Sequence, residues 1–211
     1  MSQGCLVEGC DRKHEANGYC GKHNCQLRRC GRILKRSLKD PNEIILEHDI
    51  CRINLYDLSG AVKDETIIDA EDYHLVKNHK WSLINAGYAF TRIGKKAIGL
   101  SSLVLGVHAT RQYVVDHKDG NTLNNRKNNL RQCTTQENFF NQKLRSNNVS
   151  GFKGVHWDKQ LGKWRARIKV NYIGKHLGCF VNKEDAAVAY NNAALKNYGE
   201  FARLNIIDMG V

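Results

Sequence analysis

Residues 114–142, VVDHKDGNTLNNRKNNLRQCTTQENFFNQ, decide the fold of the central part of the chain. The valines at the start predict a strand, and residues 119–121, Asp-Gly-Asn, predict a turn. Residues 130–133 predict a second strand. Thr134 and Glu137 have the spacing of a capping box, which begins a helix. The stretch therefore predicts a strand, a turn, a second strand and a helix.

Three side chains of this stretch suit the hydrolysis of a phosphodiester bond. Asp116 and Asn138 offer hard oxygen ligands for Mg²⁺ or Mn²⁺. A neutral His117 can take a proton from water near physiological pH. A metal would polarise the phosphate, so one ion and one base suffice. His-Asp pairs in turns and Asn-rich turns are also common structural features, so the residue types alone leave a purely structural role open.

The residues DHKDGNTLNNRKNNL, followed by TTQEN, resemble the HNH endonuclease motif in the variant whose last ligand is Asn, as seen in phage homing endonucleases. The resemblance implies that His117 is the general base and that Asp116 and Asn138 are metal ligands. It also implies that Asn129 fastens the hairpin around the base, and that cleavage leaves 5′-phosphate and 3′-hydroxyl ends.

The charge of the chain favours a polyanionic partner. Lys and Arg number 33 against 21 Asp and Glu, which gives a formal net charge of +12. Three basic blocks, residues 1–40, 76–140 and 141–205, flank the acidic segment 41–75. We therefore expect double-stranded DNA as the partner, with the acidic segment turned away from phosphate.

Nothing in the sequence predicts a membrane partner or export. No apolar run approaches the ~18 residues that span a bilayer. The N-terminus MSQGCLVEGC lacks the basic and apolar parts of a secretion signal. We expect the protein to stay inside the cell that makes it, in the cytoplasm of a bacterial host, where clustered cysteines favour metal binding over disulfides.

Four residues near the N-terminus form a soft ligand set suited to tetrahedral Zn²⁺. They are Cys5, Cys10, Cys20 and His23. A segment as short as residues 1–40 buries too little apolar surface to fold without such help. Four protein ligands leave no position for water, so we expect structural zinc. Cys25 and Cys30 repeat the spacing of the first pair and leave a second ligand set open.

Residues 41–100 contain short apolar runs separated by turn residues, a pattern typical of a small β-rich adaptor. Within it, Tyr73, Val76 and either His79 or Lys80 have helical spacing and predict one short helix. Trp81 is a large aromatic residue in a small unit, so we expect it in the core.

Residues 164–170, WRARIKV, alternate strictly between apolar and basic side chains. This predicts a strand with a core face and a basic face that presents Arg165, Arg167 and Lys169. We expect a turn at Gly174, a further strand in HLGCF, and a helix that is capped by Asn182 and ends at Gly199. A three-stranded sheet with a cationic face fits the DNA major groove, although an ordinary solvated face has the same pattern.

The motifs FKGVHW, GKWRARI, HLGCF, EDAAVAYNNAA and GEFARLN resemble the plant ethylene-response-factor, or APETALA-type, DNA-binding domain. The resemblance covers residues 151–205 and implies a three-stranded sheet with one helix. It places five residues at positions where that family contacts DNA: Lys153, His156, Arg167, Lys169 and His176.

These features together predict an α+β chain of four modules. They are a zinc-binding module with a basic linker (1–40), a β-rich adaptor (41–100), an HNH ββα-metal nuclease (101–146) and an APETALA-type DNA-binding domain (147–207). The predicted function is that of a metal-dependent homing endonuclease that nicks or breaks DNA at a recognised site, as a monomer or homodimer. The alternative is a DNA-binding regulator with an inactive nuclease motif.

Overall fold

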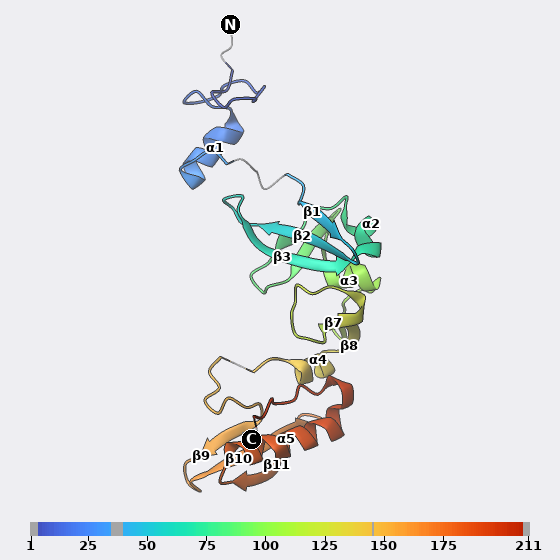
Figure 1. Ribbon diagram of the computed structural model, residues 1–211. Coiled ribbons are helices and arrows are strands. Elements are labelled where there is room, and N and C mark those ends of the chain that lie inside the picture. Colours follow the sequence, from blue (N-terminus) through green and yellow to red (C-terminus); the bar gives the residue numbers. More distant parts are fainter. Residues whose placement is uncertain (1–3, 35–39, 145, 209–211) are drawn as a thin grey trace. The chain divides into compact units, whose positions relative to one another are not determined.

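The computed structural model describes residues 4–34, 40–144 and 146–208. Within these residues the protein has mixed α and β structure, with three three-stranded sheets and one two-stranded sheet (Figure 1). This confirms the prediction of a mixed fold built from several small sheets. None of the described helices has the length and apolar character needed to cross a membrane.

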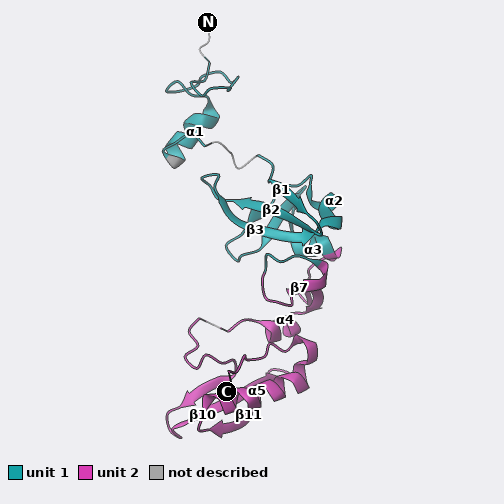
Figure 2. Ribbon diagram, viewed as in Figure 1, with its two compact units in different colours: residues 1–104, 122–126 teal, residues 105–121, 127–211 magenta. Residues whose placement is uncertain are grey.

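The chain divides into two compact units (Figure 2). The first contains residues 1–104 and 122–126, and the second contains residues 105–121 and 127–211. Each unit therefore combines parts of more than one predicted module. The layout in four modules stays a prediction.

Helix α1 (Gly21–Cys30) is the first helix of the chain. Cys20 holds the N-cap position, so Cys20 and His23 lie within the first turn. The helix ends at Gly31, whose φ of 67° is left-handed, as glycine at this position readily allows.

Residues 44–105 form two small antiparallel sheets and three short helical segments. The sheets are β1 (Ile44–Glu47), β2 (Ile50–Tyr56) and β3 (Val62–Asp69), then β4 (Ser82–Leu83), β5 (Ala89–Ile93) and β6 (Lys96–Gly99). The helical segments are η1 (Ala70–Asp72), α2 (Tyr73–Val76) and α3 (Leu100–Leu105). Helix α2 confirms the predicted short helix, and Trp81 is fully buried as predicted.

Residues 122–126 join the first unit through strand β3. The amide of Ile67 donates to the carbonyl of Leu123 at 2.9 Å, and the amide of Asn125 donates to the carbonyl of Ile67 at 2.8 Å. The Asn125 side chain is buried and donates to the Thr66 hydroxyl at 2.9 Å. A buried polar group that loses its hydrogen-bond partner costs free energy. These hydrogen bonds therefore hold residues 122–126 in one register against β3.

Two carboxylates of the acidic segment 41–75 are bound within the protein. Arg126 donates through Nε to Asp69 at 2.7 Å and through Nη2 to Asp49 at 2.6 Å. The hydrogen bond from Arg126 holds the pKa of Asp49 below its ordinary value. Part of the acidic charge therefore fastens residues 122–126.

The second unit begins with strand, hairpin and helix in the predicted order. The elements are β7 (Tyr113–His117), η2 (Lys127–Asn129), β8 (Leu130–Thr134) and α4 (Thr135–Asn141). Strands β7 and β8 are antiparallel, and Asp116 lies opposite Arg131. The capping box is present, because Glu137 donates its amide to the Thr134 hydroxyl and accepts from the Thr134 amide.

The rest of the second unit is a three-stranded antiparallel sheet in the order β11-β10-β9, with a long helix packed on it. The elements are β9 (Val155–Asp158), β10 (Lys163–Val170), β11 (Ile173–Phe180), α5 (Lys183–Tyr198) and η3 (Gly199–Phe201). Ala166 and Ile168 are buried, whereas Arg167 and Lys169 are exposed. The predicted alternation in β10 is therefore confirmed.

One local prediction in this region was wrong, and a second was confirmed only in part. The turn between β10 and β11 does not lie at Gly174, which belongs to β11; it is formed by Asn171 and Tyr172, with φ of 49° and 65°. Two left-handed residues suit a two-residue hairpin. Asn182 holds the N-cap position of α5 but makes no capping hydrogen bond with its side chain, which instead donates to Asp185.

Candidate active site and metal cluster

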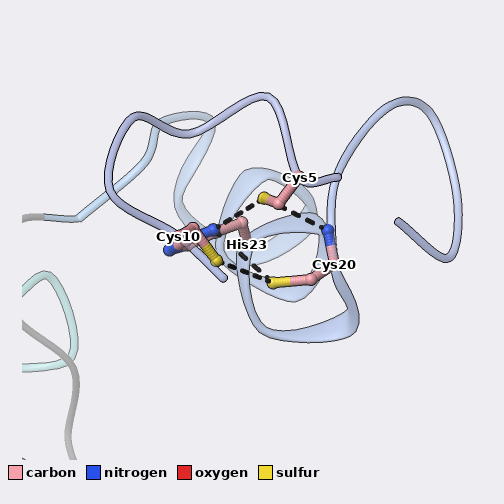
Figure 3. A group of neighbouring side chains, drawn as sticks. All are labelled: Cys5, Cys10, Cys20 and His23. Carbon is pink, nitrogen blue, oxygen red and sulfur yellow. Dashed lines mark hydrogen bonds between the residues drawn. The ribbon is translucent and has the colours of Figure 1, made fainter. Parts of the chain in front are cut away.

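Four side chains near the N-terminus point toward one another (Figure 3). They are Cys5, Cys10, Cys20 and His23, and their ligand atoms lie within 4.8 Å of one another. Cys5 Sγ is 3.1 Å from His23 Nδ1, and Cys20 Sγ is 3.5 Å from the same nitrogen and 3.9 Å from Cys10 Sγ. Two thiolates on one tetrahedral zinc ion lie about 3.8 Å apart, so the four residues fit such an ion.

The immediate surroundings favour the thiolate of Cys5, the form that binds metal. Burial raises its pKa, but hydrogen bonds from the Cys20 amide and from His23 outweigh burial and lower the pKa to about 6. Cys25 is exposed and stands outside the cluster. The side chain of Cys30 lies outside the described part of the chain.

Asn129 closes the turn that follows His117. The amide of Asp119 donates to Asn129 Oδ1 at 3.0 Å, and Asn129 Nδ2 donates back to Asp119 Oδ1 at 3.0 Å. The amide of Lys118 donates to the Asn129 carbonyl at 2.9 Å. These bonds on both sides of the hairpin support the fastening role that was predicted for Asn129.

Asp116 is buried and accepts hydrogen bonds from two side chains. Arg131 donates to Oδ2 through Nε at 2.9 Å and through Nη2 at 2.8 Å. Asn141 Nδ2 lies 3.0 Å from both carboxylate oxygens. Within the described residues Oδ2 thus accepts three hydrogen bonds and Oδ1 accepts one, so Oδ1 keeps capacity for a cation.

His117 is the last residue of β7 and is also buried. Its carbonyl accepts from Asn141 Nδ2 at 2.8 Å, which ties helix α4 to the end of the strand. Asn138 is half-buried and lies one turn before Asn141, hence on the same face of α4. The described residues include no hydrogen bond between Asn138 and Asp116. The convergence of Asp116, His117 and Asn138 stays a prediction.

The donor set at Asp116 fits a hard divalent cation. Asp116 Oδ1 can still accept, and Asn138 carries an amide oxygen on the helix face that it shares with Asn141. Carboxylate and amide oxygens are the ligand types that Mg²⁺ and Mn²⁺ prefer. Thiols and imidazoles, which suit zinc, make up the N-terminal cluster instead.

The outer face of the C-terminal sheet carries most of the predicted DNA contacts. His156, Arg167, Lys169 and His176 are exposed, and the first three line a shallow depression of about 580 Å³. Arg165 lies on the same face, is paired with Asp158 and is partly exposed. The face is therefore cationic, and it is open to solvent.

Lys153 differs from the other predicted DNA contacts. Its ammonium donates to the carbonyl of Phe140 at 2.6 Å and to that of Gln142 at 2.9 Å. Burial, with a smaller effect of Arg203, lowers the pKa of Lys153 to about 8. The side chain is thus bound to the end of α4, and we leave it out of the proposed DNA contacts.

Sequence reasoning missed Arg131 and Asn141, the two residues that hold Asp116. A signal for each was present. Arg131 stands at the position opposite Asp116 in the predicted hairpin, where opposite charges stabilise a strand pair. Asn141 follows Asn138 by three residues, so both were expected on one helix face.

Comparison with known proteins agrees with this site. A family model described as HNH endonuclease matches residues 111–139. A protein of Acanthamoeba polyphaga mimivirus, named as an uncharacterized HNH endonuclease, is 32% identical over 144 residues, which cover 67% of this chain and 74% of the relative. Protein 3.8 of Escherichia phage T7 is 43% identical over 56 residues, 26% of this chain and 46% of that protein. No solved structure matches.

The chain therefore belongs to the HNH endonuclease family. It is an endonuclease, and the segment matched by the family model contains Asp116, His117, Asn129 and Asn138.

Proposed function

We propose that this endonuclease hydrolyses phosphodiester bonds of double-stranded DNA at a recognised site, with Mg²⁺ or Mn²⁺ bound by Asp116 and Asn138. The observation that carries the proposal is the buried Asp116 carboxylate, held by Arg131 and Asn141, directly before His117 at the end of β7. A buried carboxylate with one oxygen still able to accept is a typical ligand for a catalytic cation.

His117 is the proposed general base. A neutral imidazole takes a proton from the attacking water at near-neutral pH. Asn129 fixes the turn after His117, and Asn141 holds the His117 carbonyl, so the backbone that follows the base is fixed. When bound, the divalent cation supplies charge that stabilises the phosphate and the departing oxygen.

The outer face of the C-terminal sheet is the proposed DNA-recognition surface. Arg165, Arg167 and Lys169 give it positive charge, His156 and His176 lie beside them, and a β-sheet can enter the major groove. The arrangement of strands and helix is the one that the APETALA-type resemblance implies, and this supports assigning the segment to that kind of domain.

The chain has one nuclease motif, whereas cutting both strands takes two reactions. We propose that a monomer nicks and that a homodimer, or two successive nicks, breaks both strands. The relatives come from a phage and a giant virus, which supports a homing endonuclease of viral origin that acts inside an infected host cell.

We further propose that the N-terminal cluster binds structural zinc. The four ligand atoms lie within 4.8 Å of one another, and four is the number of ligands that tetrahedral Zn²⁺ takes. A structural role follows because such a set leaves no position for water or substrate.

The proposal is tested with purified protein and a supercoiled plasmid library that carries random inserts. Protein is incubated with Mg²⁺, Mn²⁺ or EDTA, and nicked and linear DNA are quantified. His117→Ala is the test variant. His108→Ala is the matched control, because His108 is exposed and lies outside the motif.

We expect metal-dependent cleavage that is lost in His117→Ala and kept in His108→Ala, with 5′-phosphate and 3′-hydroxyl ends at the mapped sites. Loss of the proton acceptor costs roughly 100-fold to 10,000-fold in rate. Tight DNA binding without cleavage under any of the metal conditions would favour the DNA-binding regulator instead.

A further inference from the structure

Arg131 connects two regions of the second unit. At one end of the guanidinium, Nε and Nη2 donate to Asp116 Oδ2. At the other end, Nη1 donates to the carbonyl of Glu200 at 2.9 Å. The guanidinium carbon lies 4.0 Å from the centre of the Phe201 ring, a cation–π contact. The Arg131 side chain is 11% exposed, so these contacts are largely shielded from solvent.

Glu200 and Phe201 belong to η3, which follows directly after α5, the helix that packs on the C-terminal sheet. Two further contacts join this part to helix α4. The rings of Phe140 and Tyr198 stack at 3.7 Å with an interplanar angle of 10°. Lys153 donates to carbonyls at the end of α4. The segment that carries the proposed recognition surface is therefore joined to the hairpin and helix of the proposed active site, through α5, η3 and Lys153 rather than through the surface residues themselves.

The contacts leave the two oxygens of Asp116 unequal. Oδ2 is occupied by two nitrogens of Arg131, whereas Oδ1 accepts only from Asn141 within the described residues. A planar guanidinium fixed on its other side by a carbonyl and an aromatic ring cannot rotate freely, so it holds Oδ2 in one place, and Asn141, which donates to both oxygens, limits rotation of the carboxylate about Oδ2. A carboxylate held in this way presents Oδ1 in one direction.

We propose that Arg131 is a positioning residue: it orients Asp116 so that Oδ1 is the metal-binding oxygen, and it makes this orientation depend on the segment that ends the C-terminal sheet domain. The inference rests on the proposed function, in which Asp116 binds the cation. Arg131 itself contacts neither metal nor substrate.

A positioning role predicts a particular separation of kinetic constants. Loss of a residue that orients a metal ligand costs roughly 10-fold to 100-fold in activity. The affinity for the cation does not fall with it, because removal of Arg131 also removes a positive charge next to the carboxylate. The turnover number should fall while the half-saturating Mg²⁺ concentration stays the same or decreases.

The test compares zinc-loaded wild-type protein with Arg131→Gln and Arg131→Lys. Arg126→Gln is the matched control, because Arg126 follows the same turn and also pairs with two carboxylates, but these are Asp49 and Asp69 rather than Asp116. Cleavage is measured against Mg²⁺ concentration. Mn²⁺ binding without DNA is measured by electron paramagnetic resonance, with Asp116→Asn as the variant that lacks the site.

A second variant, Phe201→Leu, keeps the Arg131 ion pair and removes the ring beneath the guanidinium. Thermal melting curves show whether Arg131→Gln is folded. If it is not folded, Phe201→Leu still tests the positioning role. We expect a several-fold fall in turnover in Phe201→Leu, with unchanged affinity for DNA in EDTA, and turnover within about threefold of wild type in Arg126→Gln.

Wild-type turnover in Arg131→Gln, or a Mn²⁺ affinity that falls tenfold or more in this variant, would overturn the positioning role. A wild-type protein that binds Mn²⁺ no better than Asp116→Asn would instead refute the proposed function. The metal-binding experiment therefore separates failure of the inference from failure of its premise.

Discussion

The N-terminal cluster and the region around Asp116 are two candidate metal sites of opposite construction. The cluster gathers three sulfurs and one nitrogen that face one another, so a bound ion is fully enclosed. Asp116 instead has one oxygen occupied by protein donors and one still able to accept. In the proposed function, the first site therefore encloses its ion on all sides, whereas the second leaves its ion accessible to a substrate.

Loss of one cluster ligand is expected to have the largest effect. Cys20→Ser should abolish zinc binding and unfold residues 4–34, since structural zinc contributes on the order of 10–16 kcal/mol to such segments. Zinc content and limited proteolysis measure this, and Cys25→Ser on the same helix is the control. If Mn²⁺ binding at Asp116 were lost together with the zinc, the two sites would not be independent.

Asp116→Asn should have the next largest effect and is the converse test. We expect cleavage to fall about 100-fold or more, because the amide lacks the charge that binds the cation. Zinc content should stay at the wild-type value. The cleavage rate and the zinc content are measured on the same preparation of Asp116→Asn. Undiminished cleavage would show that Asp116 is not part of the catalytic site.

Arg167→Ala tests whether a third region, the sheet face, supplies recognition without touching either metal site. Loss of a base or phosphate contact costs about 1–3 kcal/mol in DNA affinity. Lys196→Ala is the control, because Lys196 is exposed on helix α5 and not on the sheet. Equal affinity of the two variants in a filter-binding or mobility-shift assay would refute the recognition surface.

The smallest expected effect is a pH dependence at His156. Burial and the neighbouring Arg167, Arg165 and His176 lower its pKa below the ordinary value of 6.5, although Asp158 opposes them. The folded protein thus resists protonation more than the unfolded chain, so His156 lowers stability as pH falls through about 6.5. DNA phosphate favours the protonated form, so affinity should rise a few-fold between pH 7.5 and 5.5 and lose this rise in His156→Gln.

The sequence was sufficient where structure is local. The capping box at Thr134 and the alternation in β10 each depend on neighbours within a few residues, and the gathering of three cysteines and one histidine near the N-terminus follows from one dominant chemical preference. The mixed fold class followed from these elements. Local signals also produced errors, since Gly174 was assigned a turn that Asn171 and Tyr172 make.

The sequence was not sufficient where a side chain finds distant partners. Lys153 matches a DNA-contacting position by resemblance, yet its ammonium binds carbonyls of helix α4. Arg131 could have been paired with Asp116 from the hairpin register, but its contacts with Glu200 and Phe201, which lie far along the chain, could not be predicted. Such contacts depend on tertiary packing, which neither periodicity nor spacing encodes.

Residues 122–126 lie in the middle of the hairpin sequence but belong to the first unit, where Asn125 is buried against Thr66. A gene rearrangement that transferred residues 105–211 to another protein would carry this loop away from β3, and the hydrogen bond between Asn125 and Thr66 would be lost. The adaptor and the nuclease are thus expected to be inherited together, whereas a break near residues 35–39 would exchange the zinc-binding segment without cutting any of these contacts.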